Sequence, residues 1–183
     1  AFGDNYRWNH DYGREIFQLG GNSGATICAD INNDGWVDLM TTEIVHFDVG
    51  SSSDPSEILV NAGESEPEFD RPGPDVMGLV RIDTSDTYDH GDMSGAVFDF
   101  DNDGWQDVYI GSSDYPNNRA LLFHQDEPLV FSLLDTDDYF QQFRADGVAV
   151  ADFDRDGDLD VVAGHSLMRC DGFSNSEECD ETP

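Results

Sequence analysis

The chain has 183 residues and a formal net charge of −32, because 40 acidic residues stand against eight basic ones, all of them arginine. Such an acidic chain excludes nucleic acid as a partner and disfavours an anionic membrane surface, since binding to phosphate requires basic patches. No apolar run approaches the roughly 20 residues of a membrane-spanning helix, whereas 38% hydrophobic and 11% aromatic residues are enough for a packed core.

The first predicted elements are a hairpin and a short strand. Residues 7–17 place aromatic and apolar residues on either side of a polar turn and end in Phe17, which is typical of a β-hairpin. Residues 24–29 combine small and apolar side chains, which is typical of a crowded inner strand. We expect Cys28, on this strand, to be a buried free thiol.

The next stretch, which we call loop 1 (residues 30–38), has oxygen-bearing side chains at positions 1, 3, 5 and 9. Gly35 at position 6 allows the chain to reverse sharply. Alternate side chains of a tightly curled loop converge on one point, and clustered carboxylates repel each other without a cation. Ca²⁺ takes six to eight such hard oxygen ligands. The predicted ligands are Asp30, Asn32, Asp34, Asp38 and the carbonyl of Trp36.

A second hairpin and a long connection lead to a second copy of this loop. Residues 56–69 read as a strand, a polar turn and a strand ending in Phe69. Residues 70–92 contain two prolines and several aspartates and read as an irregular surface connection. Helical periodicity is not convincing anywhere in the chain. After a small apolar strand at residues 95–98 comes loop 2 (residues 99–107). Its predicted ligands are Asp99, Asp101, Asp103, Asp107 and the carbonyl of Trp105.

The same order of elements is then repeated. Residues 118–131 read as a hairpin, residues 147–151 read as a small apolar strand, and loop 3 (residues 152–160) follows. Three copies with glycine in register predict about three bound Ca²⁺. The predicted ligands of loop 3 are Asp152, Asp154, Asp156, Asp160 and the carbonyl of Asp158.

These loops differ from the EF-hand. An EF-hand loop requires a bidentate Glu at position 12 and helices on both sides. Position 12 here is Thr41, Ile110 or Ala163, and the residues that follow each loop are short, β-branched and bounded by Gly or Ser. We therefore expect calcium loops that connect strands.

The repeated motif resembles the FG-GAP/VCBS repeat, a calcium-binding β-propeller repeat also found in integrin α-subunits, and is especially similar to bacterial proteins of the ASPIC/UnbV type. The resemblance is carried by residues 90–107, 117–123 and 147–160. It implies that each calcium loop joins the first and second strands of a blade. Asn32 departs from the acidic pattern, which implies a weaker first site.

The predicted fold is all-β, a partial β-propeller of about three four-stranded blades. Three blades cannot close a ring, since propellers have four to eight, so neighbouring blades are expected from the same or another chain. The predicted units are the end of a preceding blade at residues 1–23, a blade with loop 1 at 24–92, a blade with loop 2 at 93–146, and the start of a blade with loop 3 and a cysteine-bearing tail at 147–183.

The predicted function is that of a non-catalytic module that is extracellular, at the cell surface or periplasmic. Its calcium is structural, and it contacts a protein or glycan or assembles a larger complex. Two alternatives stay open, a domain attached to or part of a secreted enzyme and a purely structural spacer. The sequence contains no G-x-S-x-G, H-E-x-x-H or P-loop motif, so an enzyme is the less favoured reading.

Other residues allow more than one interpretation. The excess acidity fits a solvated surface, further cation sites or a basic partner. Trp36 and Trp105 fit packing between blades better than sugar binding. His46, His90, His124 and His165 lie near the loops and fit turn hydrogen bonds better than a transition-metal site. Cys170 and Cys179 bracket a polar stretch and can close a small disulfide in an oxidising compartment.

Overall fold

The computed structural model describes residues 23–45, 55–66, 68–80, 90–112, 120–134 and 147–164. This part of the chain consists of ten strands and one helix of four residues, so the all-β prediction is confirmed. Within it, no helix has the length and apolar character that crossing a bilayer requires. The hairpin predicted at residues 7–17 and the cysteines of the tail lie outside the described residues.

The first four strands form one antiparallel meander. β1 (Ser23–Ala29) pairs with β2 (Asp38–Val45), which pairs with β3 (Glu57–Asn61), and β3 pairs with the two-residue strand β4 (Phe69–Asp70). This is the strand order of a propeller blade. The predicted hairpin at residues 56–69 corresponds to β3 and β4.

The next four strands repeat the meander. β5 (His90–Phe98) pairs with β6 (Asp107–Ser112), β6 pairs with β7 (Leu121–Glu127), and β7 pairs with β8 (Val130–Leu133), all antiparallel. β7 and β8 form the second predicted hairpin.

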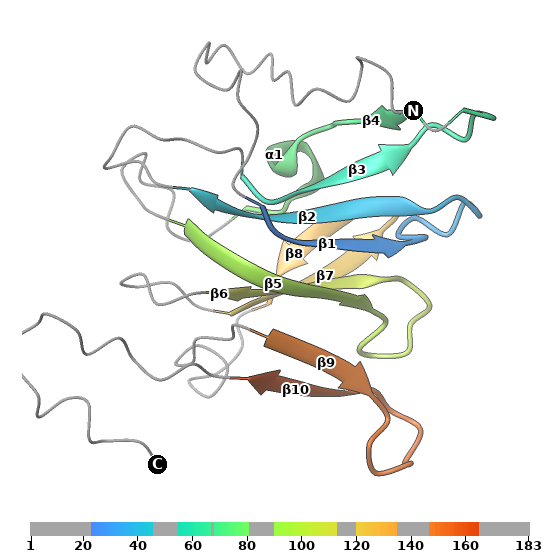
Figure 1. Cartoon of the computed structure of the whole chain (residues 1–183). Helices are drawn as coiled ribbons and strands as arrows, with labels where there is room; N and C mark the ends of the chain where they lie inside the picture. Colours follow the sequence, from blue (N-terminus) through green and yellow to red (C-terminus); the bar gives the residue numbers. More distant parts are fainter. Residues whose placement is uncertain are drawn as a thin grey trace, which may run out of the picture.

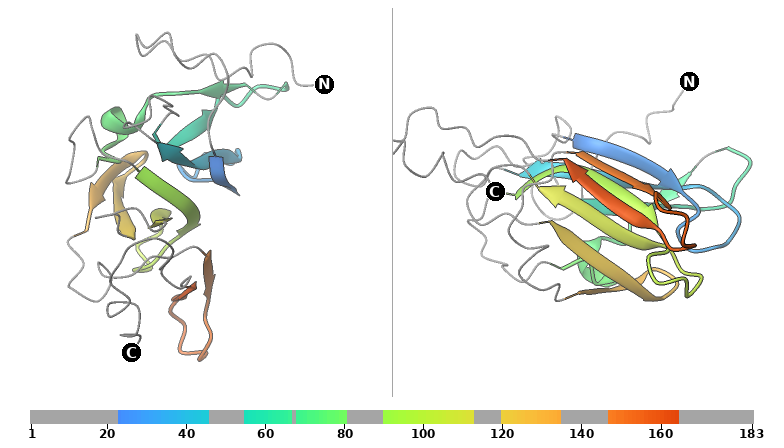
Figure 2. Two further views of the ribbon diagram at one scale, coloured as in Figure 1. Left: turned by 60° about the vertical axis from the view of Figure 1, so that its left-hand side comes forward. Right: turned by 90° about the horizontal axis from the view of Figure 1, so that it is seen from below.

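The last described strands, β9 (Gly147–Ala151) and β10 (Asp160–Gly164), form an antiparallel pair of their own. A short pairing of Ile44 with Gly91 and its neighbours joins β2 to β5, so that the first eight strands form one curled sheet. β1 packs against β5, and β5 packs against β9 (Figure 1). The three strand groups follow one another around a curve (Figure 2). The described chain is therefore a partial β-propeller, as predicted.

The core lies between successive strand groups, because alternate side chains of a strand point to opposite faces. On β6, Val108 and Ile110 belong to the cluster shared with the first blade, which includes Met40 and Ile58. Tyr109 points to the other face, into a second cluster. The second cluster is formed by Phe98, Tyr109, Ala120 and Leu122 with β9 and β10 residues Val148, Val150, Val161 and Ala163 packed against it.

Two predictions about this framework are wrong. The connection after β4 contains the helix α1 (Pro74–Met77), whose Met77 is buried in the core; a single turn is too short to show helical periodicity in the sequence. Cys28 is exposed, because burial alternates along β1 and this residue falls on the open face of the strand. The predicted unit boundaries stay predictions.

Candidate metal centres

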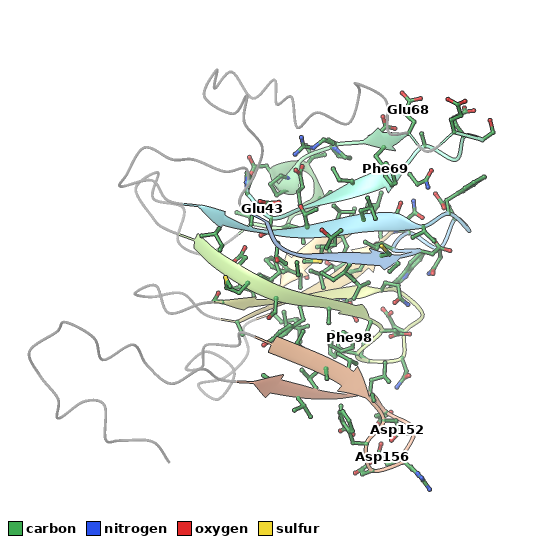
Figure 3. The ribbon with its side chains drawn as sticks, viewed as in Figure 1. Glu43, Glu68, Phe69, Phe98, Asp152 and Asp156 are labelled. Carbon is green, nitrogen blue, oxygen red and sulfur yellow. The ribbon has the colours of Figure 1, made fainter. Side chains whose placement is uncertain are left out.

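Loops 1, 2 and 3 connect β1 to β2, β5 to β6 and β9 to β10. Each therefore joins the first two strands of its group, and all three lie at the same end of the strands; Figure 3 labels Asp152 and Asp156 on the third, with Glu43 at the other end of β2. Two hydrogen bonds connect successive loops. Asn33 Nδ2 donates to the carbonyl of Gly104 at 2.8 Å, and Asn102 Nδ2 donates to Asp158 Oδ1 at 2.9 Å.

The three loops share one backbone conformation. The glycine at position 6 has a φ between 91° and 103° in every copy, which a residue with a Cβ rarely adopts. Position 4 is also left-handed, which asparagine tolerates better than most residues. The sequence pattern did not single this position out. The position-4 residues are Asn33 (φ 58°), Asn102 (φ 62°) and Arg155 (φ 66°).

The carboxylate at position 1 holds the turn closed. Asp99 accepts hydrogen bonds from the backbone N–H groups of Asp103, at 3.1 Å, and Gly104, at 2.9 Å. Asp30 makes the same two contacts in loop 1, and Asp152 accepts from Gly157 N at 3.2 Å in loop 3. Because the two oxygens point into the turn, this side chain lies at the centre of the site.

The side chains at positions 3 and 5 each accept from the backbone N–H two residues further on. In loop 2, Asp101 Oδ1 accepts from Asp103 N at 3.2 Å, and Asp103 Oδ1 accepts from Trp105 N at 2.8 Å. The Oδ2 atoms of both residues are not used by these turns. In loop 1, the backbone N–H groups of Asp34 and Trp36 donate in the same way to Asn32 and Asp34. In loop 3, those of Asp156 and Asp158 donate to Asp154 and Asp156.

Position 9 has a second role that the sequence did not predict. Asp107 is fully buried; its Oδ2 accepts from Phe100 N at 2.9 Å, and its Oδ1 accepts from Gln125 N, on β7, at 2.8 Å. Asp38 makes the equivalent bonds to Ile31 N and Asn61 N. Burial raises the pKa of both carboxyl groups, and the backbone hydrogen bonds partly oppose that rise. Position 9 thus ties the loop to the blade's third strand.

The oxygen atoms of these side chains are close enough to share one ion. In loop 2, ligand atoms of Asp99, Asp101 and Asp107 lie within 4.8 Å of one another, as do those of Asp152, Asp154 and Asp160 in loop 3. Two oxygens bound to one Ca²⁺ at 2.3–2.6 Å are separated by no more than about 5 Å.

One atom in loop 3 points to the ion directly. Asp152 Oδ1 is buried and has no hydrogen-bond partner among the described residues. A buried carboxylate oxygen without a partner is costly, and a cation in the loop would satisfy it. The residues present therefore fit calcium. The assignment of individual ligands, including the carbonyls of Trp36, Trp105 and Asp158, stays a prediction.

Loop 1 differs from the other two. Asn32 Nδ2 donates to Asp34 Oδ2 at 2.8 Å, so the amide supplies part of the positive charge that a cation would supply. An ion in this loop has to replace that bond and meets one carboxylate fewer. This contact gives a physical reason for the predicted weaker first site.

His124, on β7, faces loop 2. Its Nε2 lies 3.3 Å from Asp101 Oδ2 and 3.4 Å from Asp103 Oδ2, and its Nδ1 lies 3.0 Å from Asp126 Oδ1. Burial lowers the pKa of the imidazole, but the hydrogen bond with Asp126 and the charges of Asp107 and Asp101 outweigh it, so the net pKa is raised. The equivalent position in the first blade is Val60, next to Asn61, and it offers no ligand.

The remaining candidates are placed as follows. Trp36 is 45% exposed and packs over Gly63, in the connection between β3 and β4 of its own blade, so the prediction that it packs between blades is not supported. Trp105 is half-buried. His46, His165, Cys170 and Cys179 lie outside the described residues, as does the side chain of His90.

Comparison with known proteins gives one result at the level of families. Residues 84–163 match the FG-GAP-like repeat. The matched segment runs through β5 to β10 and contains loops 2 and 3. No curated protein shows a significant match to the chain, and the closer resemblance to ASPIC/UnbV proteins stays a prediction. The second and third strand groups of the chain therefore carry an FG-GAP-like repeat.

Proposed function

We propose that this chain is a non-catalytic, calcium-binding β-propeller module that works outside the cytoplasm, in the extracellular space, at the cell surface or in the periplasm. There it contacts a protein or glycan or assembles a larger complex. The observation that carries the proposal is the same loop conformation three times over, with carboxylate oxygens close enough to share an ion in loops 2 and 3 and with Asp152 Oδ1 buried without a partner among the described residues in loop 3.

The role proposed for calcium is structural. Each loop joins the first two strands of a blade, and through the position-9 carboxylate it is also tied to the third strand in the first two blades. An ion that binds only the ordered loop stabilises the folded state, by about 2.7 kcal/mol at a hundredfold excess over Kd.

The proposed location follows from the same chemistry. Extracellular calcium modules bind with a Kd of about 10⁻⁴–10⁻³ M, and such sites fill only in millimolar calcium. Three Ca²⁺ would neutralise only a small part of the net charge of −32. The surface therefore stays strongly acidic, which favours a basic or polar partner surface and disfavours nucleic acid.

Calorimetric titration of the full chain with CaCl₂ tests the proposal. We expect saturable binding to about three sites, and loss of one site in the double variant Asp99→Asn/Asp103→Asn. Asp75→Asn, on the exposed face of α1, removes a carboxylate far from the loops and serves as the control. Equal binding by all three proteins, or no saturable binding, would refute calcium binding by the loops.

A further inference from the structure

We propose that loops 1 and 2 form a coupled pair of cation sites, in which occupation of one raises the affinity of the other, and that Gln125 is the positioning residue that couples them. This inference rests on the proposed calcium binding and extends it from separate sites to an interdependent pair.

Gln125 lies on β7 and is fully buried. Its Nε2 donates to the carbonyl of Ile31, in loop 1, at 2.9 Å and to the carbonyl of Gln106, in loop 2, at 2.8 Å. Its Oε1 accepts from Leu129 N at 2.6 Å. Both amide N–H groups and the carbonyl oxygen are used, so the side chain has one defined orientation.

The backbone of the same residue completes a path between the two sites. Asp38 Oδ2, at position 9 of loop 1, accepts from Ile31 N at 3.0 Å. The carbonyl of Ile31 accepts from the Gln125 side chain, and Gln125 N donates at 2.8 Å to Asp107 Oδ1, at position 9 of loop 2. Three hydrogen bonds in succession, through Ile31 and Gln125, thus connect a predicted ligand of one site to a predicted ligand of the other.

A second, exposed bond runs beside this buried path. Asn33 Nδ2, at position 4 of loop 1, donates to the carbonyl of Gly104, at position 6 of loop 2. Gly104 N in turn donates to Asp99, the position-1 carboxylate of loop 2. The two loops are therefore held to each other both inside the core and at the surface.

The first blade offers an internal comparison. Asn61 occupies the position of Gln125, since its N–H donates to Asp38 Oδ1 as that of Gln125 donates to Asp107 Oδ1. The shorter Asn61 amide donates to Val37 O at 3.1 Å and accepts from Gly63 N at 3.0 Å, both within its own blade. The longer Gln125 amide makes the equivalent bond to the carbonyl of Gln106 and also reaches the carbonyl of Ile31 in the neighbouring loop.

Coupling follows because a loop without its ion has to be ordered before it can bind. An ion in loop 1 fixes Ile31 and so provides Gln125 with its acceptor, which lowers the entropy cost of ordering loop 2. Coulomb repulsion between two cations acts in the opposite direction, but salt screens it over about 8 Å at physiological ionic strength. At and above that ionic strength we therefore expect positive coupling, and it must be equal in both directions.

Terbium luminescence measures the two sites separately, because Trp36 and Trp105 stand at position 7 of loops 1 and 2 and can each sensitise the ion in their own loop. The experiment uses the full chain in 0.3–0.5 M NaCl with Trp8→Phe and Trp36→Phe. Loop 3 is disabled by Asp154→Asn/Asp156→Asn in every protein, so that Trp105 reports loop 2. The Tb³⁺ affinity of loop 2 is measured with loop 1 intact and with loop 1 disabled by Asp30→Asn/Asp34→Asn. Both measurements are made with Gln125 and are then repeated with Gln125→Asn, because asparagine is the residue at the equivalent position of the first blade.

With Gln125 present, we expect disabling loop 1 to weaken Tb³⁺ binding at loop 2 by about fivefold or more, the lower end of typical coupling between sites. With Gln125→Asn we expect the effect to fall below about twofold. Suppose that loop 2 binds Tb³⁺ saturably, but that disabling loop 1 changes its affinity by the same factor with Gln125 and with Gln125→Asn, or does not change it. Either result would overturn the coupling and leave the proposed function standing. Absence of sensitised, saturable Tb³⁺ binding would overturn both.

A second variant covers the case in which Gln125→Asn does not fold. Asn33→Gly removes the exposed bond to Gly104, keeps the left-handed conformation at φ 58° and leaves the core untouched. We expect it to reduce the coupling in part. Loop 1, observed through Trp36 with loop 2 disabled by Asp99→Asn/Asp103→Asn, should show the same coupling factor, and a factor that differs clearly between the two directions would contradict the proposal.

Discussion

Aspartates within one loop have different roles, although the motif treats them alike. Asp101 and Asp103 use one oxygen in a local turn, whereas both oxygens of Asp107 accept backbone N–H groups from the loop and from β7. The alternating carboxylates could be predicted from the sequence. The bond from Gln125 could not, because it depends on the register of β6 with β7, which the sequence around the loop does not contain.

This difference predicts that two substitutions in loop 2 have different effects on stability in the absence of calcium. Asp107→Asn places an amide N–H₂ against a backbone N–H in a fully buried position, and it should lower the free energy of unfolding by about 2–3 kcal/mol even in chelator. Asp101→Asn should weaken calcium binding. It should leave the free energy of unfolding in chelator nearly unchanged, since removing this negative charge also relieves the repulsion among the carboxylates of the loop. Urea unfolding with and without EDTA distinguishes the two. Similar losses in EDTA for both would contradict a separate structural role for position 9.

Tyr109 predicts an alkaline limit to stability. Burial raises the pKa of its phenol to about 12, from 10.0. In the unfolded chain the phenol ionises near pH 10, whereas in the folded chain it keeps its proton until about pH 12. The contribution of Tyr109 to the free energy of unfolding is therefore fully present below pH 10. The free energy of unfolding falls by about 2–3 kcal/mol as the pH rises from 10 toward 12.

Urea unfolding at pH 8, 10, 11 and 12 checks this, with Tyr109→Phe as the control. The wild-type chain should lose more stability than the variant between pH 10 and 12, and the chain contains no lysine to obscure the comparison. A difference between the two proteins that stays constant over this range would contradict a raised pKa.

At the scale of elements, local signals predicted the strands better than the connections. Alternating apolar residues and loop glycines placed β1, β5 and β9 before their loops and β2, β6 and β10 after them. The connection after β4 was predicted as irregular, but Met77 and Leu79 enter the core there. This packing depends on β8, where Phe131 O lies 2.1 Å from an ideal Cβ at Gly78, and sequence within the connection carries no sign of it.

The contact of β1 with β5 predicts that Gly24 cannot be replaced. An ideal Cβ there would lie 2.4 Å from the backbone oxygen of Asp92, so Gly24→Ala forces the two strands apart. We expect a loss of about 1–3 kcal/mol in the free energy of unfolding. Gly147, on β9, has no atom within 4 Å of the same position, and Gly147→Ala serves as the matched control. Equal unfolding midpoints in urea for the two variants would contradict the close contact.

At the scale of the molecule, successive blades are joined by residues that the repeat itself does not reveal. Position 2 of each loop is apolar. Ile31 is fully buried in a cluster with second-blade residues such as Val108 and Phe123, Phe100 is partly buried against the cluster that β9 and β10 also cover, and Phe153, in the last described loop, is 55% exposed. The partial propeller could be predicted from the loops and hairpins. The hydrogen bonds of Asn33, Asn102 and Gln125 across blades could not, since they join residues that only blade packing brings together.

The most direct test of the account is thermal unfolding of the full chain by calorimetry, in excess CaCl₂ and in EDTA, with MgCl₂ at equal ionic strength as the control. A hundredfold excess of calcium over Kd should raise the free energy of unfolding by about 2.7 kcal/mol per site. For a chain of this length, that raises the melting temperature by at least about 5 °C. The double variant Asp99→Asn/Asp103→Asn should show a smaller rise. The same melting temperature in calcium and in EDTA would contradict the claim that cations in the three loops hold the strands of each blade together.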